Sequence, residues 1–118
     1  MSRDDAALVD MLNSCRAALE FLGPLDRDSF LSDRKTQSAI LHQLLILGEA
    51  TKRLSPSFRQ AHPRMPWREI TGMRDRLIHA YDRVDVEMVW TALNKRLPSL
   101  LAFLEQQAAK PPGGETNP

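Results

Sequence analysis

The sequence has little of what marks secreted, membrane or fibrous proteins. Its single cysteine, Cys15, excludes an internal disulfide and a zinc site built from several cysteines. Apolar runs such as residues 44–47 are far shorter than the roughly 20 residues that a membrane span needs. Glycine and proline number 5 and 8 and form no repeat, which excludes collagen-like and low-complexity chains. With 42% hydrophobic residues in a chain of 118, we expect one soluble, intracellular domain with a packed core.

Neither sign of charge is in excess, because the formal net charge is only +1, but the charges are unevenly distributed along the chain. Residues 1–33 carry three arginines against seven acidic residues, which gives −4. Residues 52–76 carry seven basic residues against two acidic ones, which gives +5. A basic centre of this kind indicates either a polyanion-binding surface or helix-surface charge that is balanced by acids elsewhere.

Apolar residues at three- and four-residue steps predict helices. The first helix carries one apolar stripe, which includes Cys15, and ends at Gly23. Asp33 is expected to cap a long second helix that runs to about residue 54. Within that helix the small Gly48 permits close approach of another helix, and Glu49 is expected to be a buried acid that is hydrogen-bonded across the bundle.

The second half of the chain predicts three further helices. A short one is expected over residues 57–61, and a longer one begins near Trp67 and runs to residue 81, with Ile78 among its apolar residues. Asp85 is expected to cap the last helix, which Pro98 kinks or splits. No segment alternates with period two, so the fold class is all-α. We predict an antiparallel four-helix up-and-down bundle over residues 1–110 with an extra short helix, and a disordered tail over residues 111–118.

The densest group of polar side chains lies at the end of the third long helix. Asp75 and His79 are four residues apart and share a face, so Asp75 is expected to accept a hydrogen bond from His79 and fix its tautomer. Arg74 lies about 140° from His79 around an ideal helix, so one copy brings them together poorly. Two copies around a two-fold axis would place both sets along one groove. There an arginine would bind a phosphate and a histidine would exchange protons, which is the chemistry of metal-free RNA cleavage.

The same residues also have purely structural interpretations. A histidine at a helix end stabilises the last carbonyls, and neighbouring arginine and aspartate often form surface ion pairs. A DNA-recognition helix within residues 52–76 is a third possibility, which the prolines Pro56, Pro63 and Pro66 disfavour.

Several short strings, taken in order, resemble the HepT-like branch of the HEPN superfamily. They are Gly48-Glu49-Ala50, residues 63–67, residues 70–81, Val84-Asp85, Val89-Trp90 and Leu97-Pro98. Their order and spacing match over roughly residues 5–105. The resemblance implies a helical bundle that forms a homodimer, in which two R-x-x-x-x-H motifs meet in a shared cleft and cleave RNA without a metal or other cofactor. Arg74 and His79 would be catalytic, with Asp75 and Arg76 in support.

The resemblance also implies a biological setting. Members of this branch typically act in the cytoplasm as the toxin of a prokaryotic toxin–antitoxin pair. Their antitoxin, MNT, is a minimal nucleotidyltransferase that uses ATP and a metal to transfer AMP onto the tyrosine of the motif, here Tyr81. Relatives usually carry Phe-Gly after this tyrosine, whereas this chain has Asp82 and Arg83, which alter the turn and the fit to the antitoxin. The alternative is a non-catalytic subunit that only binds such a nucleotidyltransferase.

Overall fold

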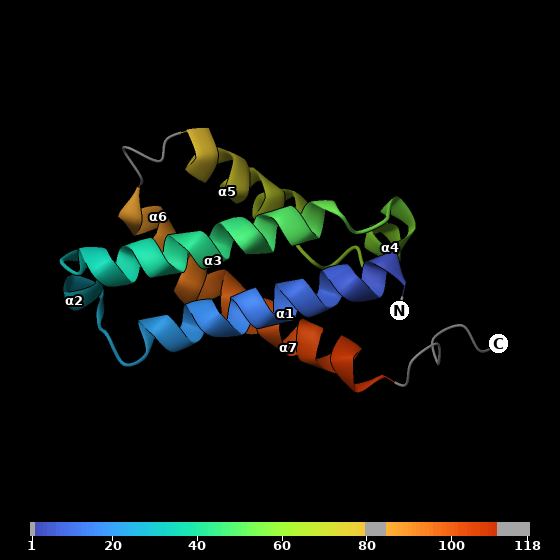
Figure 1. Ribbon diagram of the computed structural model, residues 1–118, viewed down its shortest axis with the longest axis horizontal. Coiled ribbons are helices and arrows are strands. Elements are labelled where there is room, and N and C mark those ends of the chain that lie inside the picture. Colours follow the sequence, from blue (N-terminus) through green and yellow to red (C-terminus); the bar gives the residue numbers. More distant parts are fainter. Residues whose placement is uncertain (1, 80–84, 111–118) are drawn as a thin grey trace.

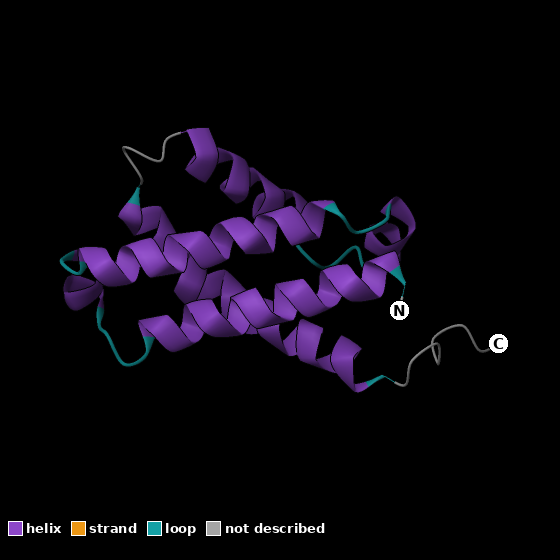
Figure 2. Ribbon diagram, in the orientation of Figure 1, coloured by secondary structure: helices purple, strands orange, loops and turns teal. Residues whose placement is uncertain are grey.

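A computed structural model describes residues 2–79 and 85–110 of the chain, and these residues are almost entirely helical (Figures 1 and 2). The predicted all-α fold class is confirmed, since these two ranges contain no β-strand. The elements are α1 (Arg3–Leu22), α2 (Arg27–Leu31), α3 (Arg34–Lys52), α4 (Pro56–Ala61), α5 (Trp67–His79), α6 (Val86–Thr91), the π-helical segment η2 (Ala92–Arg96) and α7 (Leu97–Ala109).

Four long helical units alternate in direction and form the bundle. In Figure 1, α1 runs from right to left, α3 returns beside it, α5 runs back above α3, and the unit α6–η2–α7 crosses behind α1 and α3. Helix α3 packs along α1 on one side and against α5 on the other, and α7 packs against α1. The predicted bundle is confirmed, but it has two additional short helices, α2 and α4, rather than one.

Side-chain caps explain where the helices begin. Asp33 and Asp85 accept hydrogen bonds from the backbone N–H groups of Thr36 and Met88, as the sequence predicted for the two helix starts. Asp26 caps α2 in the same way, because its side chain accepts a hydrogen bond from the backbone N–H of Ser29. Gly23 ends α1 with a φ of +53°, in the left-handed region that favours glycine.

The core lies where α1, α3, α5 and α7 meet. Its largest fully buried side chains are Met11, Phe30, Ile40, Leu44, Leu47, Leu54, Leu93, Leu97, Leu100, Leu104, Val89 and Thr51. Burial of a single side chain of the Leu class stabilises the fold by about 1.5–3 kcal/mol, so this set dominates the free energy of folding. No described helix is long and apolar enough to cross a bilayer.

Pro98 interrupts the last helical unit as predicted, but the interruption takes the form of a π-turn. Proline lacks an N–H group, and its ring would clash with the carbonyl of Asn94 in a regular helix. The chain widens over residues 92–96, where Leu97 donates its N–H to the carbonyl of Ala92. The helix therefore continues into α7 with Pro98 in its first turn.

Candidate active site on helix α5

Helix α5 buries one apolar stripe and leaves the opposite face to solvent. Ile70, Met73 and Leu77 are buried at three- and four-residue steps. Ile78 was expected among the apolar residues of this helix but is 39% exposed. It follows the buried Leu77 by one residue, so it lies on the flank of the stripe and not at its centre.

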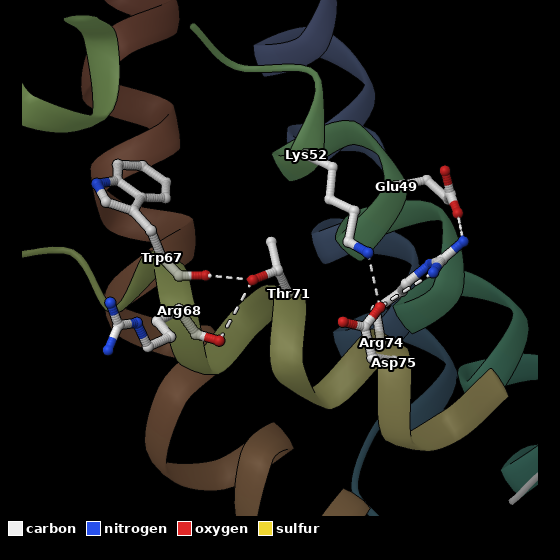
Figure 3. Close-up of polar contacts among 7 residues, drawn as sticks. All are labelled: Glu49, Lys52, Trp67, Arg68, Thr71, Arg74 and Asp75. Carbon is white, nitrogen blue, oxygen red and sulfur yellow. Dashed lines mark hydrogen bonds and ion pairs between the residues drawn. The ribbon is translucent and has the colours of Figure 1, made fainter. Parts of the chain in front are cut away.

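Arg74 lies on the flank of α5 that faces α3, and its side chain is only 21% exposed. Its Nη2 atom forms an ion pair with Oε1 of Glu49 on α3, and its Nη1 atom donates to Oδ1 of Asp75 at 3.0 Å (Figure 3). Its Nε atom is buried and has no hydrogen-bond partner among the residues that the structure describes. Arg74 is thus held between two carboxylates from two helices.

Gly48 makes this arrangement possible. A Cβ atom built on Gly48 would overlap Cβ and Cγ of Arg74, and it would lie 3.5 Å from the Arg74 Cα. The prediction that Gly48 permits close helix approach is therefore confirmed. The prediction for Glu49 is correct in part, because it bonds across the bundle but its side chain is 51% exposed rather than buried. It lies at the surface because it follows Gly48 by one residue and points past the side of α5.

Asp75 has different partners from the one predicted. It was expected to accept a hydrogen bond from His79, but within residues 2–79 and 85–110 its recorded partners are Arg74 and Nζ of Lys52, the latter at 2.7 Å. Two cations outcompete one imidazole for the same carboxylate. The hydrogen bond from Lys52, followed by that from Arg74, lowers the pKa of Asp75 below its ordinary value of 3.8, so the carboxylate is ionised at neutral pH.

His79 and Arg76 are exposed on the face of α5 that points away from the core. His79 is the last residue of the helix that the structure describes and lies five residues after Arg74, so the two side chains project in directions about 140° apart. The structure does not bring Arg74 and His79 together within one chain. Tyr81, Asp82 and Arg83 lie outside the described residues, so the proposed modification site is not placed.

A pocket lies beside this surface, lined by residues of α3, α5 and the unit α6–η2–α7. It has a volume of about 270 Å³ and is lined mainly by apolar side chains, with Glu69, Arg76 and Arg96 at its polar edge. In the part of the chain that the structure describes, this surface included, no group of three or more His, Cys, Asp or Glu side chains could hold a metal ion.

Sequence reasoning missed Lys52 as a member of this cluster. It was counted only within the basic segment of residues 52–76. The available signal was its spacing from Glu49, since residues three apart lie on the same side of a helix. Glu49 and Lys52 lie about one turn apart on α3. They form ion pairs with Arg74 and Asp75, which follow one another on α5.

Comparison with known proteins gives the family of this chain. The chain matches the family described as ribonuclease HepT-like over residues 11–107, which includes α3, α5 and the whole charged cluster. This chain belongs to the ribonuclease HepT-like family, within the HEPN superfamily. The residues that carried the resemblance, from Gly48 to Pro98, all lie inside the matched range.

Several relatives in this HepT-like family cover most of the chain. A protein of Thermococcus cleftensis named "Probable ribonuclease HepT" is 40% identical over 99 residues, which is 84% of this chain and 90% of the relative. Two proteins named "Putative RNase" come from Methanocaldococcus jannaschii and Caldanaerobacter subterraneus. The first is 33% identical over 86% of this chain and 84% of its own, and the second is 37% identical over 79% and 83%. No solved structure gave a significant match.

Proposed function

We propose that this protein is a cytoplasmic, metal-independent endoribonuclease that acts as the toxin of a toxin–antitoxin pair. The observation that carries the proposal is the state of Arg74, a partly exposed guanidinium held in one orientation at the surface of a chain with ribonuclease-named relatives. An oriented arginine recognises a phosphate through paired N–H groups, which a mobile surface arginine does less well.

The reaction needs only a base, an acid and a cation. His79 of one chain removes the proton from an RNA 2′-hydroxyl, and the 2′-oxygen attacks the adjacent phosphorus. The bond from phosphorus to the 5′-oxygen breaks, and the departing oxygen takes a proton from a second His79, which leaves a 2′,3′-cyclic phosphate and a 5′-hydroxyl. Arg74 donates hydrogen bonds to the phosphoryl oxygens as negative charge builds up on them.

A homodimer would supply the second histidine and would bring together the two side chains that diverge within one chain. Within one α5 helix, Arg74 and His79 project about 140° apart and cannot hold the same phosphate. A two-fold axis near the exposed end of α5 would bring His79 of one chain toward Arg74 of the other. The exposed His79, Arg76 and Ile78 on this end of α5 leave it free for such a contact.

The activity would be controlled at Tyr81. In this proposal a cognate MNT-type nucleotidyltransferase antitoxin, which itself uses ATP and a metal, transfers AMP to the Tyr81 hydroxyl and releases pyrophosphate. Because Tyr81 follows His79 by two residues in the sequence, the added phosphate would bring negative charge and bulk to the proposed RNA cleft and repel RNA phosphates. The proposal predicts additions of one AMP unit, about 329 Da, to the intact mass, located on Tyr81 by peptide mass spectrometry.

The nuclease assignment is tested with Arg74→Ala and His79→Ala on a fluorophore-labelled single-stranded oligoribonucleotide in the presence of EDTA. Both variants should lose cleavage while they keep the wild-type helical circular dichroism. Arg16→Ala is the matched control, because Arg16 is also ion-paired to a glutamate of another helix, Glu105. Cleavage by His79→Ala at the wild-type rate would refute the assignment, and so would a cleavage that EDTA abolishes.

The occupied state of Arg74 also favours a second candidate function. A guanidinium that two carboxylates already neutralise fits a structural role in a non-catalytic subunit that binds a nucleotidyltransferase. This candidate predicts that the wild-type chain, free of partner and of AMP, leaves every RNA intact yet still binds the nucleotidyltransferase. This candidate is excluded if the same preparation cleaves RNA and the substitution His79→Ala abolishes that cleavage.

A further inference from the structure

We propose that Glu49 is a positioning residue that orients Arg74 for RNA cleavage. The proposal rests on the proposed nuclease function and adds to it a residue from a different helix. Glu49 is 25 residues before Arg74 in the chain and belongs to α3, yet its carboxylate binds the guanidinium directly (Figure 3).

The backbone of α3 prepares this contact. Because Gly48 has no side chain, Cβ and Cγ of Arg74 occupy the space where a Cβ atom would stand. The stem of Arg74 therefore lies flat on α3 and its guanidinium ends beside the next residue, Glu49. A larger residue at position 48 would lift Arg74 away from α3 and separate it from the Glu49 carboxylate.

Glu49 and Asp75 hold opposite corners of the guanidinium, because Glu49 forms an ion pair with Nη2 and Asp75 accepts a hydrogen bond from Nη1. They differ in what they fix. Asp75 is next to Arg74 in the chain and moves with α5, whereas Glu49 ties the guanidinium to the α1–α3 core of the bundle. Each Nη atom has two N–H groups, so one on each remains for a phosphate after both carboxylates have bound.

The charges around Arg74 indicate that Glu49 orients the guanidinium and contributes little to the stability of the fold. Glu49, Arg74, Asp75 and Lys52 alternate in sign along the cluster and sum to zero. Both outer members are exposed, Glu49 at 51% and Lys52 at 40%, and exposed ion pairs contribute little to the free energy of folding. The loss of Glu49 should therefore leave the fold intact and free the guanidinium to leave its place on α3.

The experiment compares Glu49→Gln with Glu105→Gln. Glu105 is the matched control because its side chain is 49% exposed and it also binds an arginine of another helix, Arg16, at 3.1 Å. Steady-state cleavage of the labelled oligoribonucleotide gives kcat and KM, and Arg74→Ala marks the loss of the guanidinium. A second readout is the NMR signal of the Arg74 Nε–H group, assigned by its absence from Arg74→Lys, which reports the arginine environment whether or not RNA is cleaved.

We expect Glu49→Gln to lower kcat by about 10- to 100-fold with little change in KM, because it misplaces a group that acts in the transition state. The Arg74 Nε–H signal should shift, and Glu105→Gln should change neither quantity. Wild-type kcat in Glu49→Gln alongside an inactive Arg74→Ala would overturn the role of Glu49 alone. Equal losses in Glu49→Gln and Glu105→Gln would also overturn it, whereas undiminished cleavage by Arg74→Ala would count against the nuclease proposal itself.

Discussion

Gly48 of α3 and Arg74 of α5 are packed so closely that the arginine stem fills the volume a side chain at position 48 would take. Glycine in the middle of a helix costs about 0.5–1 kcal/mol relative to alanine. Its presence here is explained by what the missing Cβ allows, which is the contact between α3 and the guanidinium-bearing side of α5.

Gly48→Ala should destabilise the protein and reduce cleavage. The new methyl group would overlap Cβ and Cγ of Arg74, which are part of the stem and cannot swing away. Overpacking of this kind costs about 1–3 kcal/mol, more than the helix propensity of alanine returns. Urea unfolding followed by circular dichroism measures the stability, and kcat on the oligoribonucleotide measures the displacement of Arg74.

Gly72→Ala is the matched control for that substitution. Gly72 lies within α5, and a Cβ atom there would meet nothing within 4 Å. The same change should therefore raise the free energy of unfolding by up to about 1 kcal/mol. If both variants gained stability, the close packing of Gly48 against Arg74 would be disproved.

Asp75→Asn should lose less stability in acid than the wild type does. Asp75 has a pKa below its ordinary value of 3.8 in the folded chain, because Lys52 and Arg74 bind its ionised form. The folded state is therefore stabilised above the unfolded-state pKa, and this contribution disappears as the pH falls through the folded-state pKa. The urea midpoint is measured at neutral pH and at a pH below 3.8. Between these two conditions it should fall further for the wild type than for Asp75→Asn. The capping carboxylates of Asp26 and Asp33 also have lowered pKa values and remain in both proteins, so only the difference reports Asp75.

Cys15 should be inert to thiol reagents in the folded chain. It is fully buried in α1, and its Sγ lies 3.7 Å from the carbonyl oxygen of Leu97. Burial, with a smaller contribution from Glu105, raises the pKa of the thiol from 9.0 to about 12. The unfolded chain therefore loses this proton at a lower pH than the folded one, and stability falls as the pH rises above 9.0.

Thiol labelling and alkaline unfolding measure these two effects. Labelling of native protein at pH 8 should proceed only as fast as the chain opens, and urea should release it. Cys15→Ala should lose less stability than the wild type between pH 9 and pH 11. Rapid labelling without denaturant would show that the α1–α7 contact opens freely.

The sequence was sufficient for the long helices and for the caps Asp33 and Asp85, but not for the short helix α2, because the former depend on local patterns. The apolar stripe of α1 and the caps Asp33 and Asp85 can be read from residues within a few positions of one another. The effect of Pro98 was also local, but the π-turn before it was not predictable. A helix can kink at a proline or widen into a π-bulge, and the residues around Pro98 did not distinguish these two outcomes.

The partners of the charged residues were less predictable, because they depend on the contact between two helices. The spacing of Asp75 and His79 along one helix allows a hydrogen bond between them, and reasoning from that spacing gave the wrong partner for Asp75. The register of α3 against α5 places Lys52 and Glu49 within reach instead, and no single-helix argument contains that register. Gly48 was a sequence feature that indicated close approach at this level of the two helices.

Mixing inactive chains should restore cleavage if the site is shared between two copies. In the proposed dimer, Arg74 of one chain acts with His79 of the other. A heterodimer of Arg74→Ala and His79→Ala chains would hold one intact pair, contributed by both subunits. The mixture, after partial denaturation and refolding to exchange subunits, should cleave the oligoribonucleotide. Cleavage should be slower than in the wild type, because only one His79 remains and water must supply the proton for the departing oxygen.

Each variant alone should stay inactive after the same treatment, because neither homodimer contains both groups. Chains that carry both substitutions, mixed with either single variant, provide the control for refolding, since they also lack an intact pair. Cleavage that never returns in the mixture, although native mass spectrometry shows heterodimers, would mean that Arg74 and His79 do not act across the interface. The divergence of the two side chains around α5 would then argue against a common phosphate site, because a helix that holds them about 140° apart cannot bring both to one phosphorus by itself.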